Sequence, residues 1–224
     1  MAFLPNKPQE FTGGCSCSAI RYTIKIPALD QRPEAPGALP TPIDKKGHTI
    51  TTRFPLIGFD HCLSCRRACG APVQLWVIVP NSWTSFTLQR RDAERAGSYS
   101  DPFSPTEAKA YATSDFVDPS KEVLESTYLG VYESSPKTHR SFCTRCGTPL
   151  TYAFVGDRPP SWTLGPVMDI AAGTMDQESF EQIKPDRHDW WEDGTAWVKK
   201  VLREGDGGVL IRHPTGRLST KVED

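Results

Sequence analysis

The sequence predicts a mainly β protein, and three stretches carry this prediction. Residues 20–26 alternate strictly between apolar and polar side chains, which is the pattern of a half-buried strand. Residues 73–79 form an apolar run rich in β-branched side chains that ends at Pro80. Residues 83–88 follow across a short turn, and we expect them to pair antiparallel with 73–79.

Further strands are expected along the chain, with helices confined to short segments. The segments with strand character are 47–59, 124–134, 138–142, 148–155 and 162–172. A short helix is expected from Ser104 to about Thr113, because residues 104–107 form a capping box with proline at the first helical position. Asp176 is expected to cap a helical turn through Phe180, and residues 197–202 have helical spacing.

These elements predict one β-rich domain over residues 11–204, interrupted by two insertions that contain short helices. Residues 1–10 have little to bury and are expected to form a flexible tail. The first insertion, about 27–47, is rich in proline, and the second, about 89–121, is polar. Residues 205–224 are glycine-rich and charged, and we interpret them as a C-terminal extension.

Composition excludes several classes of function. The chain has 224 residues, with 26 Lys plus Arg against 27 Asp plus Glu. This balance gives no net field that would attract nucleic acid or an anionic membrane. No apolar run is long enough for a transmembrane helix, and the N-terminus lacks the pattern of a secretory signal. We therefore expect a cytoplasmic protein, in which clustered cysteines favour metal binding or catalysis over disulfides.

Two cysteine pairs lie far apart in the sequence. Cys15 and Cys17 are separated by one residue, and Cys143 and Cys146 by two. Four thiolates are sufficient for a closed tetrahedral zinc site, and glycines flank both pairs, as metal-binding turns often require. The alternative is that these are buried free thiols. We predict a structural zinc ion bound by all four.

A third cluster of chemically active side chains occupies residues 59–70. Its thiols are Cys62, Cys65 and Cys69, which cannot complete a tetrahedron without another ligand. Asp60 is the first candidate for that ligand and His61 the rival. Cys69 could approach the site if a helical turn follows, or it could be a small buried thiol. We predict a second zinc site here with an open position, as catalytic zinc sites have.

Cationic side chains and a late histidine complete the set of candidates. Arg66 and Arg67 could hold the carboxylates of a substrate, or they could be solvated or structurally paired. His188 lies in an aromatic segment over residues 184–191, where it could act as a general acid–base group. A loop closed by its aromatic side chains is the alternative interpretation of this segment.

The order of the three cysteine motifs resembles a known family. Gly14-Cys15-x-Cys17, Cys62-x-x-Cys65-Arg-Arg and Phe142-Cys143-x-x-Cys146-Gly-Thr-Pro-Leu150 are together similar to the glutathione-dependent formaldehyde-activating enzymes, a family that also includes centromere protein V. The resemblance covers roughly residues 11–200. It implies a β-tent fold of antiparallel sheets, a structural zinc on the outer four cysteines, and a second zinc on a Cys-x-Cys-x-x-Cys run. In this chain Asp60 replaces the first cysteine of that run.

The resemblance implies a zinc-dependent carbon–sulfur lyase-type enzyme, or a metabolic tailoring enzyme that diverged from one. Its partner would be a small molecule, such as glutathione, a thiol adduct or a small carbonyl or hydroxy compound, and no nucleic acid is expected. Asp60, His61, Arg66 and His188 are the candidate catalytic residues. The alternative is a non-catalytic zinc-stabilised binding module, which would hold one zinc ion per chain.

Overall fold

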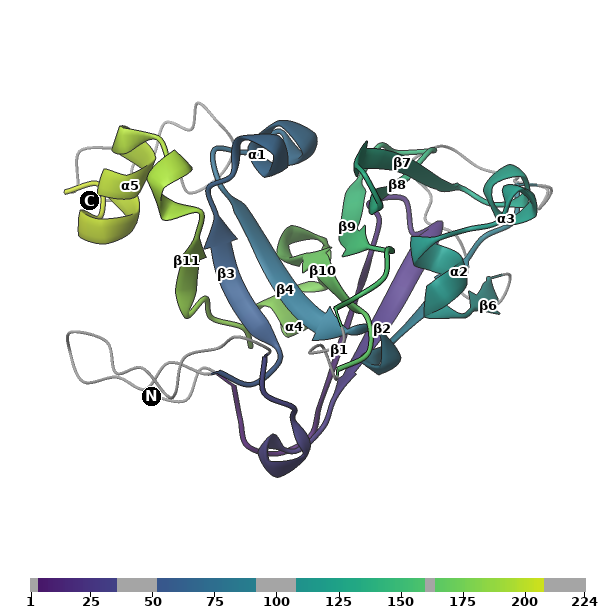
Figure 1. The fold of residues 1–224 in the computed structure, drawn as a ribbon, viewed down its shortest axis with the longest axis horizontal. Coiled ribbons are helices and arrows are strands. Elements are labelled where there is room, and N and C mark those ends of the chain that lie inside the picture. The colour runs from purple at the N-terminus through teal and green to yellow at the C-terminus, as the bar shows by residue number, and fades with distance from the viewer. Residues whose placement is uncertain (1–3, 36–51, 92–107, 160–163, 208–224) are drawn as a thin grey trace, which may run out of the picture. The chain divides into compact units, whose positions relative to one another are not determined.

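A computed structural model describes residues 4–35, 52–91, 108–159 and 164–207 (Figure 1). The described chain is mainly β, as predicted, and its strands form two sheets. Every pairing for which a register is described is antiparallel. The helices are short: η1 (Leu29–Gln31), α1 (Leu63–Cys69), η2 (Asn81–Trp83), α2 (Thr113–Val117), α3 (Lys121–Ser126), η4 (Ala172–Thr174), α4 (Gln177–Phe180), η5 (Trp191–Asp193) and α5 (Ala196–Glu204).

The chain divides into two compact units. The larger comprises Met1–Phe59 and Leu75–His188, and the smaller comprises Asp60–Gln74 and Asp189–Asp224. The domain expected over residues 11–204 therefore includes parts of both units. Both sheets belong almost entirely to the larger unit, whereas α1 and α5 belong to the smaller one.

The first sheet has four strands in the order β1-β2-β5-β6. The alternation predicted for residues 20–26 is confirmed, because Ile20, Tyr22, Ile24 and Ile26 are buried while the residues between them are more exposed. Burying such a side chain stabilises the fold by roughly 1.5–3 kcal/mol. The strands are β1 (Gln9–Gly14), β2 (Ile20–Ile26), β5 (Thr84–Leu88) and β6 (Lys109–Tyr111).

The second sheet has seven strands in the order β11-β3-β4-β10-β9-β8-β7. Its centre is apolar on both faces of β4, where Trp76, Val77 and Val79 are all buried. A single hydrophobic cluster combines side chains of both sheets, and within it the rings of Phe86 and Phe116 stack with centroids 3.6 Å apart. The strands are β3 (Leu56–Asp60), β4 (Gln74–Pro80), β7 (Leu129–Ser135), β8 (Thr138–Cys143), β9 (Pro149–Phe154), β10 (Val167–Ala171) and β11 (Arg187–Asp189).

The pairing predicted for residues 73–79 and 83–88 is wrong. Both segments are strands, but β4 lies beside β3 and β10, whereas β5 pairs with β2 and β6. The connection between them is the 3₁₀ turn η2, which begins directly after Pro80, the last residue of β4. This turn carries the chain from one sheet to the other instead of folding it back into a hairpin.

Four smaller predictions are also corrected. Residues 124–126 are helical, because Ser120 caps α3 by accepting a hydrogen bond from the amide of Val123. Residues 109–111 form an edge strand rather than helix, and the predicted helix start at 104–107 lies outside the described residues. Residues 187–189 form the short strand β11 within the expected aromatic loop. Residues 4–10 are not loose, because Arg32 donates to the carbonyl of Pro5 and β1 begins at Gln9.

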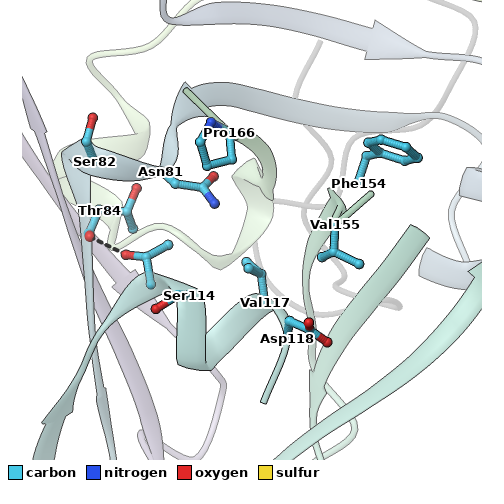
Figure 2. Close-up of a pocket in the computed structure, with 10 residues that line it drawn as sticks. Asn81, Ser82, Thr84, Ser114, Val117, Asp118, Phe154, Val155 and Pro166 are labelled. Atoms are coloured by element: carbon cyan, nitrogen blue, oxygen red, sulfur yellow. Dashed lines mark hydrogen bonds between the residues drawn. The ribbon is translucent and has the colours of Figure 1, made fainter. Parts of the chain in front are cut away.

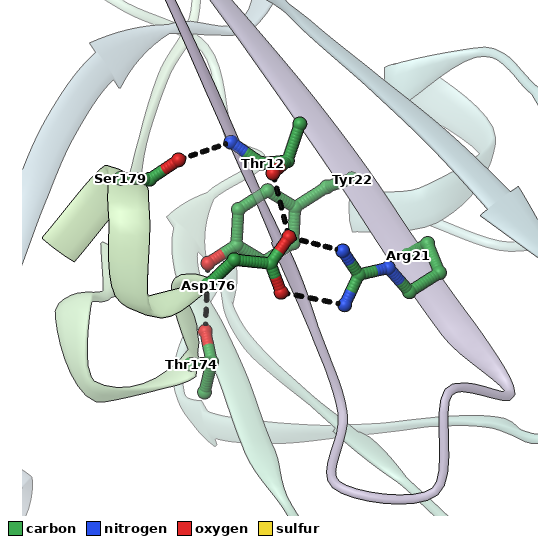
Figure 3. A network of polar contacts seen from close by, with 6 residues as sticks. All are labelled: Thr12, Arg21, Tyr22, Thr174, Asp176 and Ser179. Carbon is green, nitrogen blue, oxygen red and sulfur yellow. Dashed lines mark hydrogen bonds and ion pairs between the residues drawn. The ribbon is translucent and has the colours of Figure 1, made fainter. Parts of the chain in front are cut away.

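A polar network fastens α4 to the first sheet (Figure 3). Asp176, at the N-cap of α4 as predicted, does not cap with its side chain but accepts hydrogen bonds from both terminal guanidinium nitrogens of Arg21 on β2. It also accepts from the hydroxyl of Thr12, 2.6 Å away, while Ser179 accepts from the amide of Thr12 at 2.9 Å. The tertiary partner thus outcompetes the local helix cap.

Among the described residues, no helix combines the length and apolar character needed to cross a membrane.

Candidate metal centre

Two loops of the larger unit bring four cysteine sulfurs together. Cys15 and Cys17 lie in the turn between β1 and β2, whereas Cys143 ends β8 and Cys146 lies in the turn before β9. The four sulfurs all lie within 4.8 Å of one another. The Cys15–Cys17 separation is 3.6 Å and the Cys17–Cys143 separation is 3.8 Å. A tetrahedron with zinc–sulfur bonds of about 2.3 Å has sulfur–sulfur edges of about 3.8 Å.

Backbone hydrogen bonds shape the first cysteine turn. The amide of Cys15 donates to the carbonyl of Ile20 at 2.9 Å, and the amide of Ser18 donates to the carbonyl of Cys15 at the same distance. The amide of Ile20 in turn points at the sulfur of Cys15, 3.3 Å away. A donor aimed at sulfur stabilises the thiolate, which is the form that binds metal.

The second cysteine turn has the same design. The amide of Gly147 donates to the carbonyl of Cys143 at 2.8 Å, and Gly147 adopts a φ of 75°, a conformation in which a side chain would be strained. The hydroxyl of Thr148 lies 3.1 Å from the sulfur of Cys146. Thr148 also accepts a hydrogen bond from the amide of Ser16, so one side chain links the two turns.

The spacing of the four thiols suits a shared metal ion rather than disulfides. All are reduced, and sulfur–sulfur distances of 3.6 Å or more are far from the roughly 2.05 Å of a disulfide. The thiol of Cys143 hydrogen-bonds to the sulfur of Cys15, which lowers the pKa of Cys15 to about 5. The same contact raises the pKa of Cys143, and burial raises the pKa of Cys17. The group could bind a metal ion such as zinc.

The smaller unit contains a second group of ligand atoms from Asp60, Cys62 and Cys65, all within 4.8 Å of one another. Asp60 ends β3 with 6% of its surface exposed, and its Oδ1 accepts a hydrogen bond from the amide of Cys62 at 2.7 Å. Cys62 is the N-cap of α1, and Cys65 lies within the first turn of this helix. The order strand, turn, helix thus gathers three ligands from six consecutive residues.

Four other predicted participants lie outside this group of ligand atoms. Cys69 ends α1, and four helical residues correspond to a rise of about 6 Å from Cys65. His61 is fully buried, its ring meets Trp191 edge to face at 5.1 Å, and burial lowers its pKa, which favours the neutral imidazole. Arg66 is half-buried, and Arg67 is exposed.

His188 belongs to the larger unit and is exposed on β11. Its ring stacks on Phe59 with centroids 5.6 Å apart. The two tryptophans that follow it differ in exposure. Trp190 is 68% exposed and has a left-handed backbone conformation. The ring of Trp191 lies against the cationic groups of Lys199 and Arg203.

Sequence reasoning missed the polar residues that support the sulfurs. Thr148 was assigned only to a strand, although a hydroxyl two residues after a cysteine can reach back to its sulfur. Ser18 adopts a φ of 60°, which no residue pattern in the chain indicated. Comparison with known proteins adds no assignment, since no family model matches the chain and no curated protein matches it.

Proposed function

We propose that the protein is a zinc-dependent enzyme with one structural and one reactive ion. The structural ion would be held by Cys15, Cys17, Cys143 and Cys146, and the reactive ion by Asp60, Cys62 and Cys65. The observation that supports this most is the size of the second group: among the described residues it has three ligands, which would leave one tetrahedral position for water or substrate. A carboxylate in place of a third thiolate gives the metal a harder set of ligands in the hard–soft sense. Such a set favours substrates that bind through oxygen.

The reaction class we propose is carbon–sulfur lyase-type chemistry on a thiol adduct or a small carbonyl or hydroxy compound. This follows the resemblance of the three cysteine motifs to glutathione-dependent formaldehyde-activating enzymes. Zinc at the second group would supply Lewis acidity to a bound thiol, hydroxyl or carbonyl. The hydrogen bond from the amide of Cys62 holds the carboxylate of Asp60 in place, so that its second oxygen is oriented before substrate arrives.

Arg66 is the proposed anchor for an anionic part of the substrate. Its Nε is buried and has no hydrogen-bond partner among the described residues, although the side chain as a whole is half-buried. A buried cationic donor without an acceptor is unfavourable in the absence of ligand. A substrate carboxylate could fill that need with a charge-assisted hydrogen bond.

The test combines metal content with turnover. Purified protein is analysed for zinc and then incubated with ¹³C-formaldehyde and glutathione, and the exchange between free and adduct signals is followed by NMR. We expect two zinc ions per chain and accelerated exchange. Cys62→Ser should lose one ion and the acceleration while its melting temperature stays near that of the parent.

Cys69→Ser is the matched control, because it changes a thiol of the same helix outside the ligand group. It should retain both ions and full activity. A protein with two ions per chain that accelerates neither this exchange nor its reverse would remove the proposed substrate class. A protein with a single ion, unaffected by Cys62→Ser, would remove the reactive site.

One observation favours a second candidate, a non-catalytic zinc-stabilised binding module. The hydrogen bond from the amide of Cys62 to the carboxylate of Asp60 also occurs in ordinary turns that precede a helix, and such turns need no metal. In that case the chain holds one ion, and Asp60→Asn leaves the metal content unchanged.

A further inference from the structure

A cavity of about 470 Å³ lies within the larger unit, and it shares no residue with either cysteine group (Figure 2). Its volume is within the usual range of sites for small molecules. Its walls come from the turn η2 and the start of β5, from α2 and the residue after it, from the end of β9 and the residue after it, and from the segment that precedes β10. The lining residues are Asn81, Ser82, Thr84, Thr113, Ser114, Val117, Asp118, Phe154, Val155 and Pro166.

One wall carries two buried polar atoms that lack partners. Thr84 occupies a core-facing position of β5, in register with the buried Phe86 and Leu88, and it is only 8% exposed. Among the described residues, its hydroxyl Oγ1 has no hydrogen-bond partner, and neither has the carboxamide Oδ1 of Asn81. Figure 2 shows both side chains on the same side of the cavity.

The placement of Thr84 is not explained by the fold. The hydroxyl of Thr113 lies nearby, but it donates to the backbone carbonyl of Thr84 at 2.6 Å and not to the Thr84 hydroxyl. A valine would fill the same core-facing position without burying a polar atom. Buried hydroxyls without partners are uncommon in folded proteins and need a specific reason.

The opposite wall is apolar. Phe154 and Val155 line it, and Figure 2 shows both across the cavity from Asn81. The guanidinium of Arg158 lies over the ring of Phe154, 5.0 Å from its centroid, which fixes the ring in place. This wall suits the apolar body of a ligand.

The charge on the lining is negative. Of the lining residues that the structure describes, Asp118 alone carries a formal charge, and its Oδ1 lies 3.5 Å from Nδ1 of His139 outside the cavity. A carboxylate or phosphate on a ligand would meet this carboxylate with no cation from the described lining residues to balance it. The described lining therefore favours an uncharged ligand over an anion.

We infer that this cavity binds a small uncharged molecule with an apolar body and a terminal hydroxyl or amide group. The ligand's N–H or O–H donates to Oδ1 of Asn81, and its oxygen accepts from the hydroxyl of Thr84. Its apolar part packs against Phe154 and Val155 on the opposite wall. Such a ligand gives a hydrogen-bond partner to both buried polar groups at once.

The test uses 2-phenylethanol as the probe and phenylacetate as its anionic counterpart, titrated into the ¹⁵N-labelled full-length protein. We expect 2-phenylethanol to shift the amide signals of η2, α2 and residues 154–155, with phenylacetate at least tenfold weaker. Thr84→Val should weaken binding of 2-phenylethanol by roughly three- to tenfold, as expected for one hydrogen bond. Thr87→Val, on the same strand but outside the cavity, should bind like the parent.

Melting temperatures separate a ligand role from a structural one. Thr84→Val should melt at or above the temperature of the parent, because it removes a buried unpaired hydroxyl. A clear drop in melting temperature, or unchanged affinity for 2-phenylethanol in this variant, would overturn the inference. Ser114→Trp should fill the cavity from an exposed position and abolish the shifts, whereas Asp115→Trp next to it should not.

Discussion

The sulfurs of Cys17 and Cys143 lie 3.8 Å apart, although 126 positions separate the two residues in the sequence. A metal ion bound to both would close a long loop. It would join the β1–β2 turn of the first sheet to the β8–β9 turn of the second. For covalent cross-links, closing a loop of about 100 residues stabilises the folded state by about 4.7 kcal/mol in the chain-entropy model.

Removing one of these sulfurs should therefore cost both zinc and stability. Cys143→Ser is expected to lose the structural ion and to unfold at least 10 °C below the parent, since a ligand at a thousandfold its dissociation constant contributes about 4 kcal/mol. Elemental analysis and a thermal melt check this. Cys69→Ser should change neither quantity. A Cys143→Ser protein with parental melting temperature would mean that the four sulfurs do not hold a metal.

The second group should respond to the type of ligand at residue 60. Asp60→Ala removes a ligand, so the metal content should fall by one ion per chain. Asp60→Cys keeps the negative charge and supplies a thiolate, and it should keep the ion and shift the site's preference from zinc toward softer cadmium. Competition between zinc and cadmium, followed by elemental analysis of the dialysed proteins, measures this. Equal metal content in all three proteins would contradict a site at Asp60.

The pair of Arg21 and Asp176 predicts a defined dependence of stability on pH. The hydrogen bonds from Arg21, together with the one from Thr12, lower the pKa of Asp176 in the folded state. The contribution is therefore fully present above the unfolded pKa of about 3.9 and is lost as the pH falls through the lower folded value. Because the side chains are 34% and 39% exposed, it should not exceed about 1 kcal/mol.

Asp176→Asn tests this sign by urea unfolding of variant and parent between pH 3 and pH 7. The difference in free energy of unfolding should be constant from about pH 5 upward and should shrink below about pH 4. Glu178→Gln on the same helix is the matched control and should show no such trend. A difference that grows on acidification would refute the assignment of the ion pair.

Gly70 closes α1 with a φ of 64°, and a Cβ built there would meet nothing within 4 Å. Gly70→Ala should therefore cost about 1 kcal/mol from backbone strain alone. Gly173 has equally open surroundings without a positive φ, so Gly173→Ala should be close to neutral. Chemical denaturation of both variants makes the comparison. Equal stability of the two would show that α1 ends in another conformation in solution.

The sequence alone determined the elements that depend on local patterns. Alternation identified β2, apolar runs identified β4 and β9, and a CxxC or CxC spacing identified the turns that carry the outer sulfurs. These signals are local because side-chain direction in a strand and ligand spacing in a turn depend on residues only one to three apart. They were sufficient to predict a mainly β chain and a four-cysteine group.

Only the tertiary structure decided which strands are neighbours and which polar groups are buried. Periodicity could not show that β5 leaves β4 for β2, because both partners offer the same apolar face. Nor could it show that Thr84 faces a cavity, that Thr148 reaches Cys146, or that Cys69 lies outside the ligand group. Those features depend on contacts between segments that are distant in the sequence, and such contacts form only when the whole core is assembled.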